Sequence, residues 1–264
     1  MRHNNVITDR VSILGNRIDC FPEYNKLYDY IITDLRAGGA MGYVTVNNVH
    51  TMMEGYRSTE YRKIINEAYL SIPDGKPLEI VGRLKGNKSI SRLFGPTVME
   101  NFIDWGRKDG VKHFFLGGSD ESLEKLRSAI QMKFPDAKIV GMIAPPFKPL
   151  DEWDNEFFIK AINEAQPDFV WVGLGAPKQE RWMFTHHESI NALLFGIGAG
   201  FAYLAGDTKH APQWMKKASL EWLYRLMQEP RRLWKRYFTT IPPFLFLVTL
   251  ELLGFKLRSP KLQK

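Results

Sequence analysis

The chain of 264 residues is 44% hydrophobic, 25% charged and 13% aromatic, a globular composition that excludes collagen-like, low-complexity and wholly disordered classes. Its one cysteine, Cys20, excludes an internal disulfide framework and a thiolate zinc site, and it indicates a reduced, intracellular setting. The net charge of +7 is uneven, because residues 1–207 hold 24 Lys and Arg against 26 Asp and Glu, whereas residues 208–264 hold 12 against 3.

The first elements in chain order are a hairpin and a helix. Two strands are predicted within residues 11–20, on either side of Gly15-Asn16, a pair suited to a tight turn. Apolar residues then recur at helical spacing over 24–35, until Gly38-Gly39 ends the pattern. The opening residues are polar and lead into no apolar segment, so a signal peptide is not expected.

From residue 43 onward, short apolar runs alternate with helical stretches. The runs predict strands at 43–46, 112–116, 137–140, 168–172 and 192–195. Between them, helices are predicted near 51–70, 97–109, 120–133, 151–165 and 178–190. This order predicts an α/β fold with a mostly parallel sheet and helices on both faces.

The end of the chain changes character. We expect an α/β core over residues 1–207 and a basic, helical appendage over residues 208–264. Helices are predicted at 212–227, 230–239 and 243–255, separated by prolines that include Pro242-Pro243. The last of these is apolar but shorter than the roughly 20 residues that span a bilayer.

An anionic partner suits this appendage. Cations interleaved with aromatics beside a short apolar helix are typical of a segment that lies on a membrane surface. A nucleic-acid-binding protein is the alternative, although the apolar run over 244–248 has no use in that role. Packing of that run on the protein's own body or on a second subunit is also open.

Three glycine-rich loops follow predicted strands and are candidates for ligand binding. The amides after Gly173-x-Gly175, with Lys178 beside them, could hold a phosphate, although an ordinary strand-to-helix turn explains the same residues. The other two loops contain Gly117-Gly118 and Gly196-x-Gly198. None completes a dinucleotide fingerprint and no Walker A motif is present, which disfavours a nicotinamide oxidoreductase and an ordinary nucleoside triphosphatase.

Polar residues near strand ends offer few other groups for chemistry. Asp74, in Pro73-Asp74-Gly75, is the best candidate for a general base, although this tripeptide is also a turn signature. Thr45, Asn47 and Asn48 follow the first predicted parallel strand, where an asparagine can equally cap a helix. The histidines show no paired ligand spacing, so no metal is predicted. No other cofactor is expected either.

Taken together, six motifs in one order resemble the WecG/TagA/CpsF family of bacterial glycosyltransferases, from about Val11 to about Tyr237. They are Thr45-Val46-Asn47, Pro73-Asp74-Gly75, Pro145-Pro146-Phe147, Gly173-x-Gly-Ala-Pro-Lys-Gln-Glu180, Gly196-x-Gly198-Ala199 and Leu220-Glu221-Trp222-Leu223-Tyr224-Arg225-x3-Glu229-Pro230-x-Arg232.

The resemblance implies a Rossmann-like core and an inverting, metal-independent sugar transfer. The donor would be a UDP-sugar carrying a hexose or N-acetylhexosamine, such as N-acetylmannosamine, glucose or mannose. The acceptor would be a polyprenyl-diphosphate-linked saccharide in cell-surface polysaccharide or teichoic acid synthesis. Such an enzyme would lie peripherally on the cytoplasmic face of the bacterial membrane and would bind no nucleic acid. The donor sugar, the acceptor's terminal sugar and a homo-oligomeric state stay open.

The resemblance also implies roles for individual residues. Asp74 would be the general base, Thr45 and Gln179 would line the reacting sugar, and Arg225 and Arg232 would fold over the donor diphosphate. The expected substrate-binding set is Asn47, Asn48, Gly118, Pro146, Phe147, Gly175, Lys178, Gly198, Arg225, Arg232 and Lys235.

The sequence departs from the family pattern at three places. Lys235, with Arg236 next to it, stands where the family usually has arginine, so either could reach the phosphate. Phe201-Ala202 replaces Phe-Asp, and His210 replaces the arginine that often precedes Ala-Pro. The last two changes lie beside the expected sugar site and bear on donor choice.

Overall fold

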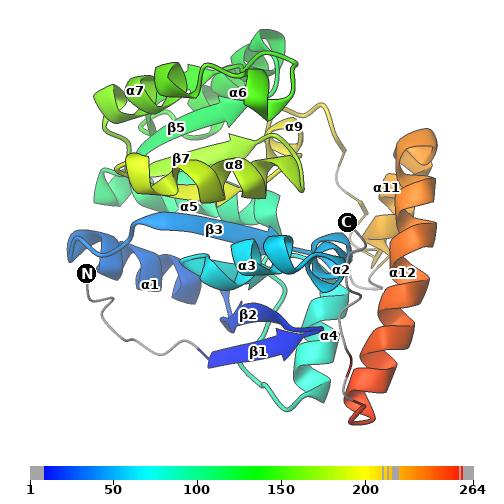
Figure 1. The fold of residues 1–264 in the computed structure, drawn as a ribbon. Coiled ribbons are helices and arrows are strands. Elements are labelled where there is room, and N and C mark those ends of the chain that lie inside the picture. The colour runs from blue at the N-terminus through cyan, green and yellow to red at the C-terminus, as the bar shows by residue number, and fades with distance from the viewer. Residues whose placement is uncertain (1–8, 210, 213, 216–219, 256, 258–264) are drawn as a thin grey trace.

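A six-stranded parallel sheet forms the centre of the computed structural model, which describes residues 9–209, 211–212, 214–215, 220–255 and 257 (Figure 1). Its strand order is β4-β3-β8-β7-β5-β6, and each neighbouring pair is parallel. The strands are β3 (Gly42–Asn47), β4 (Leu70–Pro73), β5 (Lys112–Gly117), β6 (Lys138–Ile143), β7 (Phe169–Gly173) and β8 (Leu193–Gly196). The predicted α/β class and parallel sheet are therefore confirmed.

Helices cover both faces of this sheet, as the continuous apolar strands require. Neighbouring strand residues point to opposite faces, so Phe114 joins one core cluster and Phe115 the other. One cluster contains buried side chains of α1 (Tyr24–Arg36), α5 (Gly95–Asp109), α6 (Asp120–Lys133) and α9 (Gly200–Leu204). The other contains α2 (Val49–Arg57), α3 (Thr59–Glu67), α4 (Lys76–Leu84), α7 (Asn155–Ala165) and α8 (Lys178–His186).

The predicted N-terminal hairpin is confirmed with a shifted turn. β1 (Asp9–Ile13) pairs antiparallel with β2 (Asn16–Cys20). The turn lies at Leu14 and Gly15, which have φ values of 51° and 79°, so Asn16 already pairs with Ile13. Turns of two such residues suit the twist of a hairpin.

The helix predicted over 51–70 is wrong in its extent. The chain breaks at Ser58, whose side chain caps α3 by accepting a hydrogen bond from the Tyr61 amide (3.2 Å). After α3 the chain forms β4, which the prediction missed because four buried residues carry too short a pattern to identify. The α4 helix was missed as well.

The other helices need smaller corrections. A 3₁₀ turn over Leu150–Glu152 precedes α7, which begins later than predicted. Another 3₁₀ turn over His187–Ser189 follows α8, which ends earlier than predicted. β6 extends beyond its predicted end to Ile143.

The C-terminal part contains α11 (Glu221–Gln228) and one continuous helix, α12 (Pro230–Leu252), so the predicted break at Pro242-Pro243 is wrong. A proline frees the carbonyl four residues earlier, which for Pro243 belongs to Thr239. Arg57 Nη2 of α2 donates to that carbonyl oxygen (2.8 Å), so the helix continues without an unpaired acceptor there. Part of the predicted helix 212–227 lies outside the described residues.

The long helix α12 lies along one side of the molecule, next to α2 and α11 (Figure 1). Phe244 and Val248 are buried in a core cluster, whereas Leu245 and Phe246 are exposed. The apolar run therefore packs partly on the protein's own body. Glu251 accepts from the Leu14 amide (3.1 Å) and pairs with Lys85 (2.9 Å). The division at residue 207 stays a prediction.

None of the helices in the described part of the chain combines the length and apolar composition needed to cross a bilayer.

Candidate active site

Two adjoining cavities form one cleft at the carboxyl ends of the central strands, where open parallel sheets usually bind ligands. The helical chamber, about 360 Å³, lies between α2 and α4 on one side and α11 and α12 on the other. The loop chamber, about 280 Å³, is lined by the loops after β7 and β8. Both chambers share Asn48, Asp74, Phe94, Tyr203, Arg225, Leu233 and Arg236.

Asp74 lies in this shared wall, directly after β4. Its amide donates to the carbonyl of Asn47 (2.7 Å), and its Oδ1 accepts from the amide of Gly95 (2.8 Å) at the start of α5. Burial raises the pKa of the Asp74 carboxyl, while Arg92, the Gly95 amide and Arg225 oppose that rise. The fold therefore fixes a carboxylate between two chambers and makes it a better proton acceptor than an exposed aspartate.

Arginines surround this carboxylate, and motif analysis missed Arg92 among them. Arg92 Nε donates to the Asp74 carbonyl (2.7 Å), and its guanidinium lies over the Phe94 ring (4.6 Å) and pairs with Glu221 of α11. No periodicity or motif marks this loop residue, because its role comes from tertiary contacts alone. Arg225 lies 5.8 Å from the Tyr203 ring centre and, like Arg236, lines both chambers.

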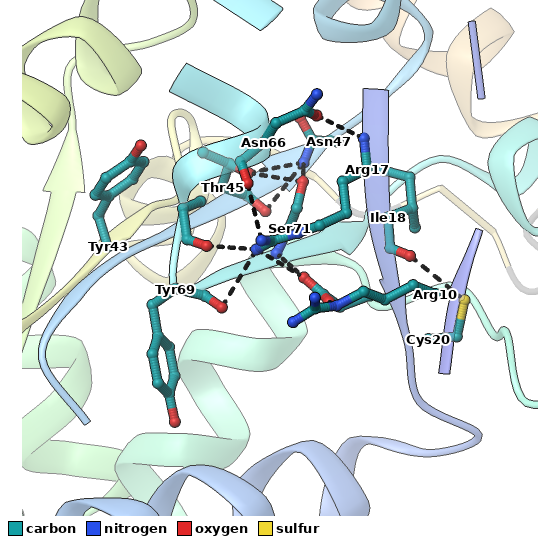
Figure 2. Close-up of polar contacts among 12 residues, drawn as sticks. Arg10, Arg17, Ile18, Cys20, Tyr43, Thr45, Asn47, Asn66, Tyr69 and Ser71 are labelled. Atoms are coloured by element: carbon teal, nitrogen blue, oxygen red, sulfur yellow. Dashed lines mark hydrogen bonds and ion pairs between the residues drawn. The ribbon is translucent and has the colours of Figure 1, made fainter. Parts of the chain in front are cut away.

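A buried polar network that includes Thr45, Asn47 and Ser71 (Figure 2) is hydrogen-bonded to the Asp74 turn. Thr45 Oγ1 donates to Ser71 Oγ (3.1 Å), and Asn47 Nδ2 donates to both hydroxyl oxygens (2.9 and 2.8 Å). The Asn47 carbonyl accepts from the amides of Asp74 (2.7 Å) and Gly75 (3.3 Å). Thr45 and Asn47 thus lie behind the cleft and support the turn that carries the carboxylate, instead of lining either chamber.

The network extends to the N-terminal hairpin. Asp19 Oδ2 accepts from the Ser71 amide (2.8 Å), and Asp19 pairs with Arg10 (2.7 Å) and Arg17 (3.1 Å). Arg17 also donates to the carbonyl of Asn66 (2.8 Å), as Figure 2 shows. The hairpin thus contacts and supports β4, the strand that directly precedes Asp74.

Replacing Ser71 with alanine should therefore destabilise the fold by about 1–3 kcal/mol, because Thr45 and Asn47 lose a buried partner. The free energy of unfolding in urea measures this effect, with the exposed Ser189→Ala as control. Equal stability of both variants would contradict a supporting role for the network.

Gln179 connects the two glycine loops of the loop chamber. Its Oε1 accepts from the amides of Gly175 (3.0 Å) and Gly198 (2.9 Å), and its Nε2 donates to Glu180 Oε1 (2.8 Å). Both glycines have positive φ values, 80° and 53°, which other residues rarely adopt. The three residues predicted from two separate motifs are thus brought together at one point.

Several other predicted residues line neither chamber. Lys178 donates to the Lys148 carbonyl (2.8 Å) and lies over the Trp153 ring (4.8 Å). The others in this group are all exposed, namely Gly118, Pro146, Phe147 and Lys235. Their binding roles stay predictions.

Two further sequence predictions concern residues that the structure does not fully describe. His210 lies outside the described residues, and so does the side chain of Arg232. Among the residues that are described, no group of three or more His, Cys, Asp or Glu side chains could hold a metal ion.

Comparison with known proteins gives one family and consistent relatives. The Glycosyl transferase WecG/TagA/CpsF family model matches residues 11–258. A Bacillus subtilis (strain 168) protein, named N-acetylglucosaminyldiphosphoundecaprenol N-acetyl-beta-D-mannosaminyltransferase, is 29% identical over 222 residues, 84% of each chain. A Staphylococcus aureus (strain MW2) protein of the same name is 27% identical over 194 residues, 71% of this chain and 72% of its own.

Proposed function

Because the chain belongs to the WecG/TagA/CpsF family of glycosyltransferases, we propose that it transfers a hexose or N-acetylhexosamine from a UDP-sugar to a polyprenyl-diphosphate-linked saccharide, with inversion and without a metal ion. The names of its relatives favour N-acetylmannosamine as the sugar and diphosphate-linked N-acetylglucosamine as the acceptor. One observation carries the proposal: Asp74, Arg225 and Arg236 lie together in the wall between two chambers.

The two chambers suit two different substrates. The loop chamber offers glycine-rich backbone to a UDP-sugar, with Arg225 and Arg236 available for its diphosphate. The helical chamber is lined by apolar side chains such as Trp222, Ile241 and Phe244, which suits an acceptor that continues into a lipid. Asp74 lies between them and would face the bond that forms.

The proposed chemistry assigns one task to each group. Asp74 takes the proton from the acceptor hydroxyl. The oxygen of that hydroxyl attacks the anomeric carbon of the donor from the side opposite UDP. The bond from that carbon to the diphosphate breaks, and UDP leaves with both bonding electrons. Arg225 and Arg236 stabilise the negative charge that develops on it.

We also propose that the enzyme lies peripherally on the cytoplasmic face of the membrane. Trp234, Phe238 and Leu245 are exposed on α12 at spacings of four and seven residues, so they share one face of the helix. The C-terminal segment that carries this face is basic, with 12 Lys and Arg against 3 Asp and Glu over residues 208–264. This pattern suits an anionic lipid surface, which is where the acceptor would be held.

A direct assay tests the proposed function. The purified protein is mixed with a panel of UDP-sugars and a polyprenyl-diphosphate-linked N-acetylglucosamine in the presence of EDTA. We expect release of UDP and an extended lipid-linked product with one member of the panel. Absence of product with every donor, with and without divalent cations, would contradict the proposal.

A further inference from the structure

The link between the two glycine loops depends on how the Gln179 amide is oriented. Gln179 is the second residue of α8 and is buried, and its single oxygen accepts both the Gly175 and the Gly198 amides. A side-chain NH₂ group only donates, so a flipped amide would leave both glycine N–H groups without an acceptor. The orientation of one amide thus sets the spacing of two loops.

The neighbouring residue, Glu180, selects this orientation. Gln179 Nε2 donates to Glu180 Oε1 (2.8 Å). An ionised carboxylate only accepts hydrogen bonds, so it pairs with the NH₂ side of the amide and repels the carbonyl side. Glu180 has 0% of its surface exposed, so water offers no competing partner.

We propose that Glu180 is a positioning residue for sugar transfer, whose carboxylate holds the Gln179 amide in the orientation that joins the Gly175 and Gly198 loops around the donor. This inference rests on the proposed function, because it takes the loop chamber as the donor site. Glu180 itself lines neither chamber, so it acts through Gln179.

The surroundings of Glu180 determine the pKa of its carboxyl group. Tyr61 of α3 and Arg236 of α12 are the ionisable groups that act on it, and Glu54 and Arg181 act in turn on Tyr61. Burial raises the pKa of Glu180 to about 7, although Gln179, Tyr61 and Arg236 each lower it. The ionised form is therefore lost as pH falls through about 7, and the selection of the Gln179 orientation weakens with it.

The link can be tested without any ligand by hydrogen–deuterium exchange. Glu180→Met keeps the size of the side chain and removes the acceptor, whereas Glu180→Gln keeps an acceptor oxygen but also offers a donor. At one fixed pH we expect the segments with Gly175 and Gly198 to exchange at least about threefold faster in Glu180→Met, with Glu180→Gln between it and the wild type. The exposed Glu188→Gln is the control and should match the wild type. Unchanged exchange at both glycine segments in a folded Glu180→Met would overturn the proposal.

Donor binding gives the second readout. The KM values for the UDP-sugar and for the acceptor are measured in the wild-type enzyme and in each Glu180 variant. In Glu180→Met we expect the KM for the UDP-sugar to rise about tenfold, while the KM for the acceptor stays within about twofold of the wild-type value. A merely structural role would change both KM values or neither, and either result would overturn the proposal. If wild-type enzyme uses no UDP-sugar, the proposed function fails, while the exchange experiment still decides the role of Glu180.

Tyr61→Phe adds a test with a defined sign. Tyr61 lowers the pKa of Glu180, so removing its hydroxyl should raise that pKa. The dissociation constant of UDP-N-acetylmannosamine, measured in an Asp74→Asn background to remove that carboxyl's titration, should then begin to rise at a higher pH. A pH profile that does not move in Tyr61→Phe would contradict the assignment of this titration to Glu180.

Discussion

Replacing Asp74 with asparagine should lower kcat by about 10²–10⁴-fold and leave the fold intact. The asparagine keeps an oxygen for the Gly95 amide, so the contact that holds the side chain against α5 can persist. What the variant loses is the ability to take a proton from the acceptor hydroxyl. Turnover is measured as UDP release and folding as thermal unfolding, with the exposed Asp136→Asn as control. Near wild-type turnover in a folded Asp74→Asn would remove Asp74 from the role of base.

The same residue predicts the acidic limb of the pH profile. The base must be ionised, and burial raises the pKa of Asp74, so activity should fall on acidification at a higher pH than an exposed aspartate would give. Burial also raises the pKa of Glu180, to about 7, but Glu180 is expected to act on donor affinity. Measuring kcat at saturating donor therefore isolates Asp74. An acidic limb of kcat that persists unchanged in the residual activity of Asp74→Asn would contradict this assignment.

The sequence motifs predicted the glycine loops and the Asp74 turn because each depends on local backbone geometry. Gly175 and Gly198 adopt positive φ values, and Asp74 belongs to a Pro-Asp-Gly signature, so residue type and order were sufficient. The continuity of α12 through Pro242-Pro243 was not predictable in this way. One contact that supports it comes from Arg57, distant in sequence, which donates to the carbonyl that Pro243 frees.

The position of Thr45 was not predictable for a similar reason. Thr45 was expected to line the reacting sugar; in the structure it is buried and its hydroxyl donates to Ser71, and its role at the sugar stays a prediction. The β4 strand itself had escaped prediction, so its residue Ser71 could not be placed next to Thr45. Arg92 was missed because only the folded chain brings it to the Asp74 carbonyl.

The arginines of α12 bear on the choice that the sequence left open between Lys235 and Arg236. Adjacent helical residues point in directions about 100° apart, so Lys235 and Arg236 need not face the cleft equally. Arg236 lines both chambers and lowers the pKa values of Glu180 and His50, whereas Lys235 is exposed and lines neither. The structure therefore favours Arg236 as the cation that acts on the leaving diphosphate.

Replacing Arg236 with alanine should lower kcat by about 10²–10³-fold, the effect of removing one group that stabilises a developing negative charge. Lys235→Ala should leave kcat within about twofold when the acceptor is presented in detergent micelles, because this removes any contribution of Lys235 to membrane binding. Arg236→Lys keeps the charge but loses the bidentate geometry, so its kcat should lie between those of wild type and Arg236→Ala. Folding of each variant is followed by thermal unfolding.

A larger loss in Lys235→Ala than in Arg236→Ala would instead place Lys235 on the diphosphate, as the family pattern implies. Since α12 also carries the exposed face formed by Trp234, Phe238 and Leu245, a dominant effect of Arg236 would mean that the helix proposed to lie on the membrane also contributes to the catalytic centre.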